Sequence, residues 1–395
     1  DHYGVTQVVF NDEVKDKIQE LRIESVIQVE GEVVSREDSL VNPKLPTGEI
    51  EISCNKFIIH SEAKVLPFLI AEDDNAPEPT RLTSRFLELR REKLHKNIIL
   101  RSQVISTMRE LMTSEGFLEI QTPILTSSSP EGAREFLVPS RLHPGKFFAL
   151  PQAPQQFKQL LMTSGFDRYF QIAPCFRDED PRADRSPGEF YQLDMELSFV
   201  EQEDVLSVNE NVISKLFQKF SKFKGSDEKF ERLAYKDSLE LYGSDKPDLR
   251  NSLKIKNISN LFENTDFRVF KEVLSSDDGV IKTIAVTLDK LPSRKYFDDL
   301  IANFTKESGR GLAYLVFSKD GWKGSISKFF SEDEFKLLET ELNLTELTVL
   351  FLVAGPRKDT YPHLARLRDK LGEDFNKVEK DIWKFCWIID YPLYE

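Results

Sequence analysis

Residues 174–199 constrain the fold more than any other part of the chain. They read PCFRDEDPRADRSPGEFYQLDMELSF, in which two alternating segments flank a charged loop that contains Pro181, Pro187 and Gly188. Alternation of this kind predicts strands, and a loop rich in proline and glycine predicts the turn that joins them. The sequence therefore predicts a β-hairpin within an antiparallel sheet.

The two faces of the second strand differ, because side chains alternate across a strand with a period of two. The apolar face, which we expect to be core, comprises Tyr191, Leu193, Met195, Leu197 and Phe199. The polar face comprises Phe190, Gln192, Asp194 and Glu196, and on the first strand Cys175, Arg177 and Glu179 share one face. Such a polar face is costly to bury unless a ligand satisfies it. The alternative is an ordinary hairpin with a salt-bridged, solvent-exposed face.

A phosphorylated aromatic ligand would suit this polar face. Arg177 offers a planar fork for phosphate or carboxylate. Phe190 offers a stacking surface, and Glu179 or Gln192 could bond to the edge of a base. The face therefore favours a nucleotide as ligand.

The runs FRDED, RADR and GEFYQLDMELSF closely resemble the second signature motif of class II aminoacyl-tRNA synthetases, in the form found in bacterial-type aspartyl-tRNA synthetases. The resemblance implies that Arg177 is the catalytic residue that binds the α-phosphate of ATP. It also implies that the rest of the motif binds ATP through Glu179, Phe190 and Gln192, aspartate through Asp194, and tRNA through loop residues Arg182 and Arg185.

Two segments ahead of the hairpin extend the resemblance. The loop SSSPEGAREFLVPSR implies that Glu131 binds the amino group of aspartate. In APQQFKQLLMTSGF, Gln155 and Lys158 stand three apart in a predicted helix, so both project from one side of it. The resemblance makes both residues aspartate-binding, with Lys158 on the side-chain carboxylate.

Composition narrows the class of protein. The 395 residues are ordinary for a globular chain, and no apolar run approaches the ~18 residues of a membrane span. Three scattered cysteines predict neither a disulfide framework nor a zinc site, and no metal ligand is assigned. The net charge of −13 would by itself argue against nucleic-acid binding.

The fold class predicted is α+β, with five consecutive parts. An incomplete, N-terminally truncated β-barrel of OB type is expected at 1–65, where Gln7 is a candidate tRNA contact, and a proline-rich linker at 66–84. The class II catalytic core, an antiparallel sheet with helices, follows at 85–250. An inserted α+β domain is expected at 251–379, and residues 380–395 return to the core.

The resemblance covers nearly the whole chain, and its implications are specific. The expected enzyme is an aminoacyl-tRNA ligase that joins L-aspartate to tRNA(Asp) with ATP, acts as a homodimer, and resides in a bacterial cytoplasm or an organelle of bacterial descent. Charging of tRNA(Asn) stays open. The third class II motif and the ligands for Mg²⁺ are expected beyond residue 395. The alternative is a non-catalytic RNA-binding paralogue.

Overall fold

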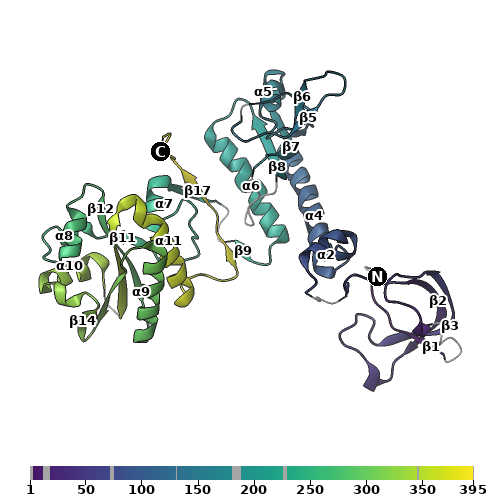
Figure 1. Ribbon diagram of the computed structural model, residues 1–395, viewed down its shortest axis with the longest axis horizontal. Coiled ribbons are helices and arrows are strands. Elements are labelled where there is room, and N and C mark those ends of the chain that lie inside the picture. Colours follow the sequence, from purple (N-terminus) through teal and green to yellow (C-terminus); the bar gives the residue numbers. More distant parts are fainter. Residues whose placement is uncertain are drawn as a thin grey trace. The chain divides into compact units, whose positions relative to one another are not determined.

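The computed structural model describes residues 3–11, 18–71, 75–129, 131–179, 188–225, 229–344 and 347–394. The chain divides into two compact units, Asp1–Thr107 and Met108–Glu395. Both units combine helices with strands, and most strand pairs are antiparallel (Figure 1). The predicted α+β class is therefore confirmed.

The first unit holds a three-stranded sheet in the order β1-β3-β2. The strands are β1 (Val8–Phe10), β2 (Val26–Ser35) and β3 (Ile50–Ser61), and all three lie within residues 1–65, where the barrel was predicted. Strand β3 pairs antiparallel with β2 and parallel with β1. Within the described residues this sheet does not close on itself, so the OB-type barrel stays a prediction.

Three helices follow: α2 (Glu78–Thr83), α3 (Arg85–Glu88) and α4 (Glu92–Ser114). Apolar residues recur at helical spacing between Arg85 and Met112 and predict one helix there, whereas the structure interrupts it between Glu88 and Glu92. The carboxylate of Glu88 is buried and accepts hydrogen bonds from Arg81, at 2.5 Å, and from Arg85. Both arginines hold the short helices around this carboxylate before α4 begins.

The predicted hairpin is confirmed in the second unit. Strands β7 (Arg168–Phe176) and β8 (Glu189–Leu197) pair antiparallel in unbroken register from Arg168↔Leu197 to Phe176↔Glu189. Strand β4 (Leu118–Glu119) runs parallel to β7 and completes a three-stranded sheet. A smaller pair, β5 (Leu137–Pro139) and β6 (Phe147–Ala149), stands separately.

The prediction of which hairpin face is core was wrong. On the apolar face Tyr191 is 51% exposed and Phe199, beyond the end of β8, is 98% exposed, whereas Asp194 on the polar face is only 9% exposed. The reason is that helix α5 (Gln155–Thr163) packs on β7 and β8 and reaches Asp194 through Lys158. The polar face therefore lies against protein.

Helix α6 (Gln202–Phe220) follows the hairpin and begins with a capping box. The Glu201 side chain accepts from the backbone N–H of Asp204, and the Asp204 carboxylate accepts from the backbone N–H of Glu201 at 2.9 Å. These bonds satisfy two donors that a helix start leaves open. In the sequence Val208, Val212 and Leu216 form an apolar stripe at helical spacing, which predicts a helix at this place, and the structure confirms it.

A five-stranded sheet forms the largest part of the second unit, in the order β11-β12-β15-β13-β14. Its strands are β11 (Ile255–Asn257), β12 (Gly279–Thr287), β13 (Ala313–Ser318), β14 (Gly321–Gly324) and β15 (Thr348–Pro356). All its neighbouring pairs are antiparallel. It lies wholly within residues 251–379, where an inserted domain was predicted; the boundaries of that domain stay a prediction.

Helices cover both faces of this sheet (Figure 1). Helices α9 (Arg294–Ser308) and α11 (Arg357–Asp374) pack on the face that contains Val349 and Phe351. Helices α8 (Arg268–Leu274) and α10 (Glu332–Leu342) pack on the face that contains Leu350 and Leu352. Alternate residues of β15 therefore enter two separate cores.

The end of the chain returns beside the segment that precedes the sheet. Strand β16 (Ile382–Trp383) pairs with β9 (Lys224–Gly225), and β17 (Cys386–Ile389) pairs with β10 (Glu231–Ala234). Rings of Phe217, Phe230, Trp383, Phe385 and Trp387 pack together around these strands. The two long segments that enter and leave the sheet thus lie side by side.

A buried ion cluster ties helix α7 (Tyr235–Tyr242) to the five-stranded sheet. The Glu240 carboxylate accepts from Lys282 at 2.7 Å, Arg357 at 2.5 Å and the Tyr361 hydroxyl at 2.6 Å. Lys282 has no exposed side-chain surface. Burial acts to raise the pKa of Glu240, but the bonds from Lys282, Tyr361 and Arg357 outweigh it and bring the pKa down to about 2.

We predict that Glu240→Gln lowers the free energy of unfolding by roughly 3 kcal/mol near neutral pH, because it leaves the Lys282 ammonium buried without a counter-charge. The pKa of Glu240 is depressed in the folded state, so its stabilisation is full above the ordinary carboxyl value of 4.5 and is lost as the pH falls toward 2. Urea unfolding at several pH values measures this difference.

The matched control is Glu272→Gln, the same change in the exposed Arg268–Glu272 pair of α8. It should alter the free energy of unfolding by less than about 0.5 kcal/mol. Equal losses for the two variants would contradict a structural role for the buried cluster.

Candidate functional site

The candidate site lies where α5 crosses the polar face of the β7–β8 hairpin. Lys158 projects from the second turn of α5 and places its ammonium 3.2 Å from Asp194 Oδ2 and 3.4 Å from Glu196 Oε2. Asp194 and Glu196 are two residues apart on β8, so both carboxylates point to the same face. The Lys158 side chain is only 13% exposed. The hairpin and the helix thus hold one cation between two anions.

Asp194 keeps unused hydrogen-bonding capacity in this arrangement. Its Oδ1 atom is buried and has no hydrogen-bond partner among the described residues. Burial raises the pKa of Asp194, Lys158 counteracts this rise by its charge and hydrogen bond, and Glu196 adds to it. A buried acceptor without a donor is costly. A hydrogen-bond donor on a bound ligand could therefore bond to Asp194 Oδ1 and remove this cost.

Cys175 marks the point where the charged groups of the site converge. It is fully buried, stands opposite Phe190 in the register, and its thiol donates to Gln192 Oε1 at 3.4 Å. Burial and the charges of Asp194 and Glu131 raise the pKa of the thiol to about 11, while Arg177 and Lys158 act in the opposite direction. Asp194, Glu131, Arg177 and Lys158 therefore all contribute to the electrostatic environment of this one thiol.

Arg177 directly follows the end of β7, and its guanidinium carbon lies 5.0 Å from the centre of the Phe190 ring. Its backbone N–H donates to Gly188 O at 2.7 Å, which closes the hairpin beyond the last strand pair. A Cβ at Gly188 would meet Arg177 O at 2.9 Å, so the close approach of the two chains favours glycine there. The arginine thus stands beside an aromatic face, at the end of the strand pair.

Within the described part of the chain, the other predicted site residues form no hydrogen bond or ion pair with Lys158 or Arg177. Glu131 is half-buried and accepts from Ser129 Oγ at 3.1 Å, and Gln155 is half-buried at the start of α5. Glu179 is exposed beyond β7. Arg182 and Arg185 lie outside the described residues. The structure therefore places Lys158 against Asp194 and Glu196, and Arg177 against Phe190.

The comparison with families of known proteins decides the class. The family described as tRNA synthetases class II (D, K and N) matches residues 77–395. The chain belongs to this family. The matched range contains the α5–hairpin site and the five-stranded sheet.

Among curated relatives, an Aspartate–tRNA(Asp/Asn) ligase of Rickettsia bellii is 52% identical over 400 residues. A protein of the same name from Rickettsia prowazekii is 51% identical over 399 residues. Each match covers 100% of this chain and 66% of the relative. The chain thus spans just under two thirds of the length of these relatives.

Solved structures agree on the fold. Asparaginyl-tRNA synthetase of Pyrococcus horikoshii, complexed with asparaginyl-adenylate, aligns with a TM-score of 0.51 at 18% identity, over 93% of this chain and 87% of that one. The Entamoeba histolytica enzyme, also in complex with asparaginyl-adenylate, aligns with a TM-score of 0.52 at 14% identity, over 93% and 86%. At such identities the likeness concerns the class II fold alone.

Two residues of the α5–hairpin site were not assigned from the sequence. Glu196 is the second anion on Lys158, and its place two residues after Asp194 on the same strand face was the available signal. Gln171 is buried opposite Asp194, and its Oε1 accepts from the Thr122 backbone N–H at 2.9 Å and from the Thr122 hydroxyl at 3.1 Å. No local pattern distinguishes Gln171, because its partner is 49 residues away.

Gln7, the predicted tRNA contact of this synthetase chain, lies in the first unit. Its Oε1 accepts from Arg36 at 2.6 Å, and its Nε2 donates to Glu51 at 3.2 Å. Gln7 is exposed, whereas Arg36 is buried. The amide is thus held in one orientation at the surface, which a solvated glutamine would not require.

In the described part of the chain, no group of three or more His, Cys, Asp or Glu side chains could hold a metal ion. No described helix is both long enough and apolar enough to cross a membrane. No residue described here is therefore assigned to Mg²⁺.

We predict that Lys158→Met lowers the free energy of unfolding by about 3 kcal/mol near pH 8, because Asp194 then lies buried without its cation. The pKa of Asp194, already raised, should rise further when Lys158 no longer opposes burial. Protonation then removes the buried charge, so the loss should shrink as the pH falls to about 5.5. Urea unfolding across this range measures the loss.

Lys336→Met is the control, since Lys336 is exposed and lies 3.8 Å from an exposed Asp333. It should change stability little at any pH in this range. A loss for Lys158→Met that does not vary with pH would contradict the role of Asp194.

Proposed function

We propose that the chain carries the aspartate-activating site of an aspartate–tRNA ligase. The aspartate α-carboxylate attacks the α-phosphate of ATP, so that aspartyl-adenylate forms and pyrophosphate leaves. A hydroxyl at the 3′ end of tRNA then attacks the adenylate carbonyl, an ester forms, and AMP leaves. The observation that carries the proposal is the nearly buried Lys158 ammonium between Asp194 and Glu196.

The charges of the site suit this substrate. Lys158 is a donor-only cation that Asp194 and Glu196 hold in place, so it is oriented before the substrate arrives. A side-chain carboxylate of aspartate would gain a charge-assisted bond to Lys158, whereas the neutral amide of asparagine would not. This favours aspartate as the amino acid, in agreement with the printed names of the Rickettsia relatives.

The other residues take complementary roles. Arg177 would bind the α-phosphate and neutralise charge that develops during attack, and Phe190 would stack on adenine, with Glu179 and Gln192 at the base. Glu131 and Gln155 would bind the amino-acid backbone, with Glu131 on the ammonium group. Catalysis in this scheme is mostly positioning and charge neutralisation.

The tRNA partner is proposed to be tRNA(Asp), with tRNA(Asn) as a second acceptor. The relatives' name, Aspartate–tRNA(Asp/Asn) ligase, supports both. Gln7 would contact the tRNA from the first unit, and Arg182 and Arg185 would contact it near the site. Residues 1–65 would be the tRNA-binding barrel, 85–250 the catalytic core and 251–379 the insertion.

We also propose ATP as substrate with Mg²⁺ as its companion ion, a homodimer, and a bacterial cytoplasm as the compartment. The dimer is supported by α4, on which Ile98, Ile99 and Leu100 are all exposed and apolar. Exposed apolar side chains on a helix favour an interface more than a solvated surface. The compartment is supported by the bacterial relatives.

We predict that Arg177→Ala in the natural protein reduces aspartate-dependent ATP–pyrophosphate exchange by at least about a thousandfold, since one preorganised charge contact to the reacting phosphate is lost. The measurement is exchange of labelled pyrophosphate into ATP. Arg294→Ala, an exposed residue at the start of α9, is the control and should keep full exchange. Exchange near the normal rate in Arg177→Ala would refute the assignment.

We predict that Gln7→Ala raises the KM for tRNA in aminoacylation by roughly tenfold and leaves pyrophosphate exchange unchanged, because exchange requires no tRNA. The magnitude corresponds to one lost hydrogen bond at an interface. Gln28→Ala, an exposed glutamine on β2, is the matched control. An unchanged KM in Gln7→Ala would remove Gln7 from the tRNA contacts.

A further inference from the structure

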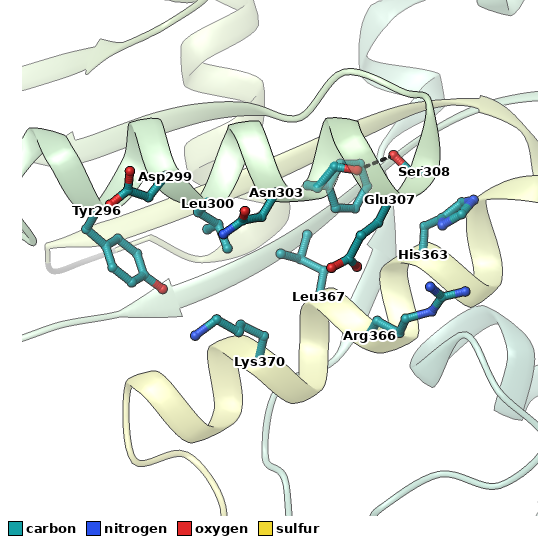
Figure 2. Close-up of a pocket in the computed structure, with 11 residues that line it drawn as sticks. Tyr296, Asp299, Leu300, Asn303, Glu307, Ser308, His363, Arg366, Leu367 and Lys370 are labelled. Carbon is teal, nitrogen blue, oxygen red and sulfur yellow. Dashed lines mark hydrogen bonds between the residues drawn. The ribbon is translucent and has the colours of Figure 1, made fainter.

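A groove separate from the synthetase site runs between α9 and α11 (Figure 2). It encloses about 310 Å³. Its floor is apolar and consists of the buried side chains Leu300, Phe304 and Leu367. Ligand pockets for small organic molecules begin at about this size. The groove therefore has room for a small molecule with an apolar part.

The two walls of the groove carry opposite kinds of polar group. On α9 the acceptors Asp299, Asn303 and Glu307 recur at every fourth residue, which places them in one row along the helix. On α11 the row facing them consists of His363, Arg366 and Lys370. Figure 2 shows the two rows along opposite sides of the groove. Acceptors thus face donors across an apolar floor.

These facing rows are not joined to each other. Among the described residues, the side chains of Asp299, Asn303, Glu307 and Arg366 form no hydrogen bond and no ion pair within 4.0 Å. Lys370 instead bonds to Asp374 on its own helix at 2.7 Å. The acidic and basic groups therefore remain solvated on either side of the groove.

His363 contributes shape more than charge. Its ring packs edge-on against Phe304, with the ring centres 6.2 Å apart. Burial lowers the pKa of His363, and the neighbouring Arg366 and Arg310 lower it further. The ring is therefore neutral near pH 7, and Arg366 and Glu307 supply the opposite charges at this end.

We propose that the groove binds a free α-amino acid with a large apolar side chain. Its carboxylate would pair with Arg366, its ammonium with Glu307, and its side chain would lie over Leu300, Phe304 and Leu367. A zwitterion satisfies both rows at once. A ligand with only a negative charge would be attracted by the donors of α11 but repelled by the acceptors of α9. A ligand with only a positive charge would be attracted by α9 but repelled by α11.

This inference does not rest on the proposed function. The groove is built from α9 and α11, whereas the synthetase site is built from α5 and the hairpin. An aspartate side chain would bring a second anion onto an apolar floor, which disfavours the proposed substrate here. The groove would therefore select amino acids that the synthetase site does not.

The experiment is calorimetric titration of the natural protein with L-leucine and L-phenylalanine. Two blocked probes test the two walls: N-acetyl-L-leucine lacks the cation, and L-leucinamide lacks the anion. We expect the free amino acids to bind and each blocked probe to bind at least about tenfold more weakly, since each loses one charge-assisted contact. No binding of the free amino acids up to about 10 mM, or equal binding of a blocked probe, would overturn the proposal.

Two variants locate the binding. Arg366→Gln and Glu307→Gln should each weaken L-leucine binding about tenfold, and both residues are exposed, so folding should persist. The controls are Arg268→Gln and Glu332→Gln on α8 and α10, which pack on the opposite face of the sheet and should bind normally. Equal effects of control and groove variants would place the ligand elsewhere and contradict the proposal.

Aspartate-dependent pyrophosphate exchange tests the synthetase proposal independently of the groove. All four variants should retain it, because none lies among the proposed catalytic residues. Loss of exchange only in Arg177→Ala, together with no leucine binding by the parent protein, would refute the groove and leave the synthetase proposal standing. The reverse pattern would refute the synthetase proposal alone.

Discussion

The packing of α5 on the β7–β8 hairpin depends on the ion pair between Lys158 and Asp194. This pair joins α5 to β8 at a distance of 3.2 Å between nitrogen and oxygen, in a place with little access to water. Because the hairpin register is unbroken, fixing Asp194 also fixes Phe190, Gln192 and Glu196 along the same face. One buried ion pair therefore orients the helix, the strand and the row of polar groups between them.

The ion cluster around Glu240 differs from the Lys158–Asp194 pair in how many of its acceptor atoms are satisfied. Glu240 accepts from Lys282, Arg357 and Tyr361, so its acceptor capacity is used within the protein. Asp194 retains a buried oxygen without a donor. A fully satisfied cluster stabilises the fold, whereas a partly satisfied one stabilises it less and can complete its bonds with a ligand. This difference supports placing substrate at Lys158 and Asp194.

The secondary structure around the site could largely be predicted from the sequence. Alternation predicted the hairpin, Pro154 and Gly165 predicted the ends of α5, and both predictions hold because they depend on neighbouring residues alone. Two predictions failed for lack of tertiary information. The break before α4 depends on the Glu88 carboxylate accepting hydrogen bonds from both Arg81 and Arg85. The burial of the polar hairpin face depends on α5 packing against it.

The sequence by itself determined the local elements, the family resemblance, and the identity of the charged residues in the motif, because these follow from residue types and short spacings. Only the tertiary structure decided which of those residues meet. Lys158 and Asp194 are 36 positions apart, and Arg36 reaches Gln7 across 29. The facing rows of α9 and α11 likewise come together through the five-stranded sheet that both helices cover. Long-range packing sets such distances, and no local pattern encodes them.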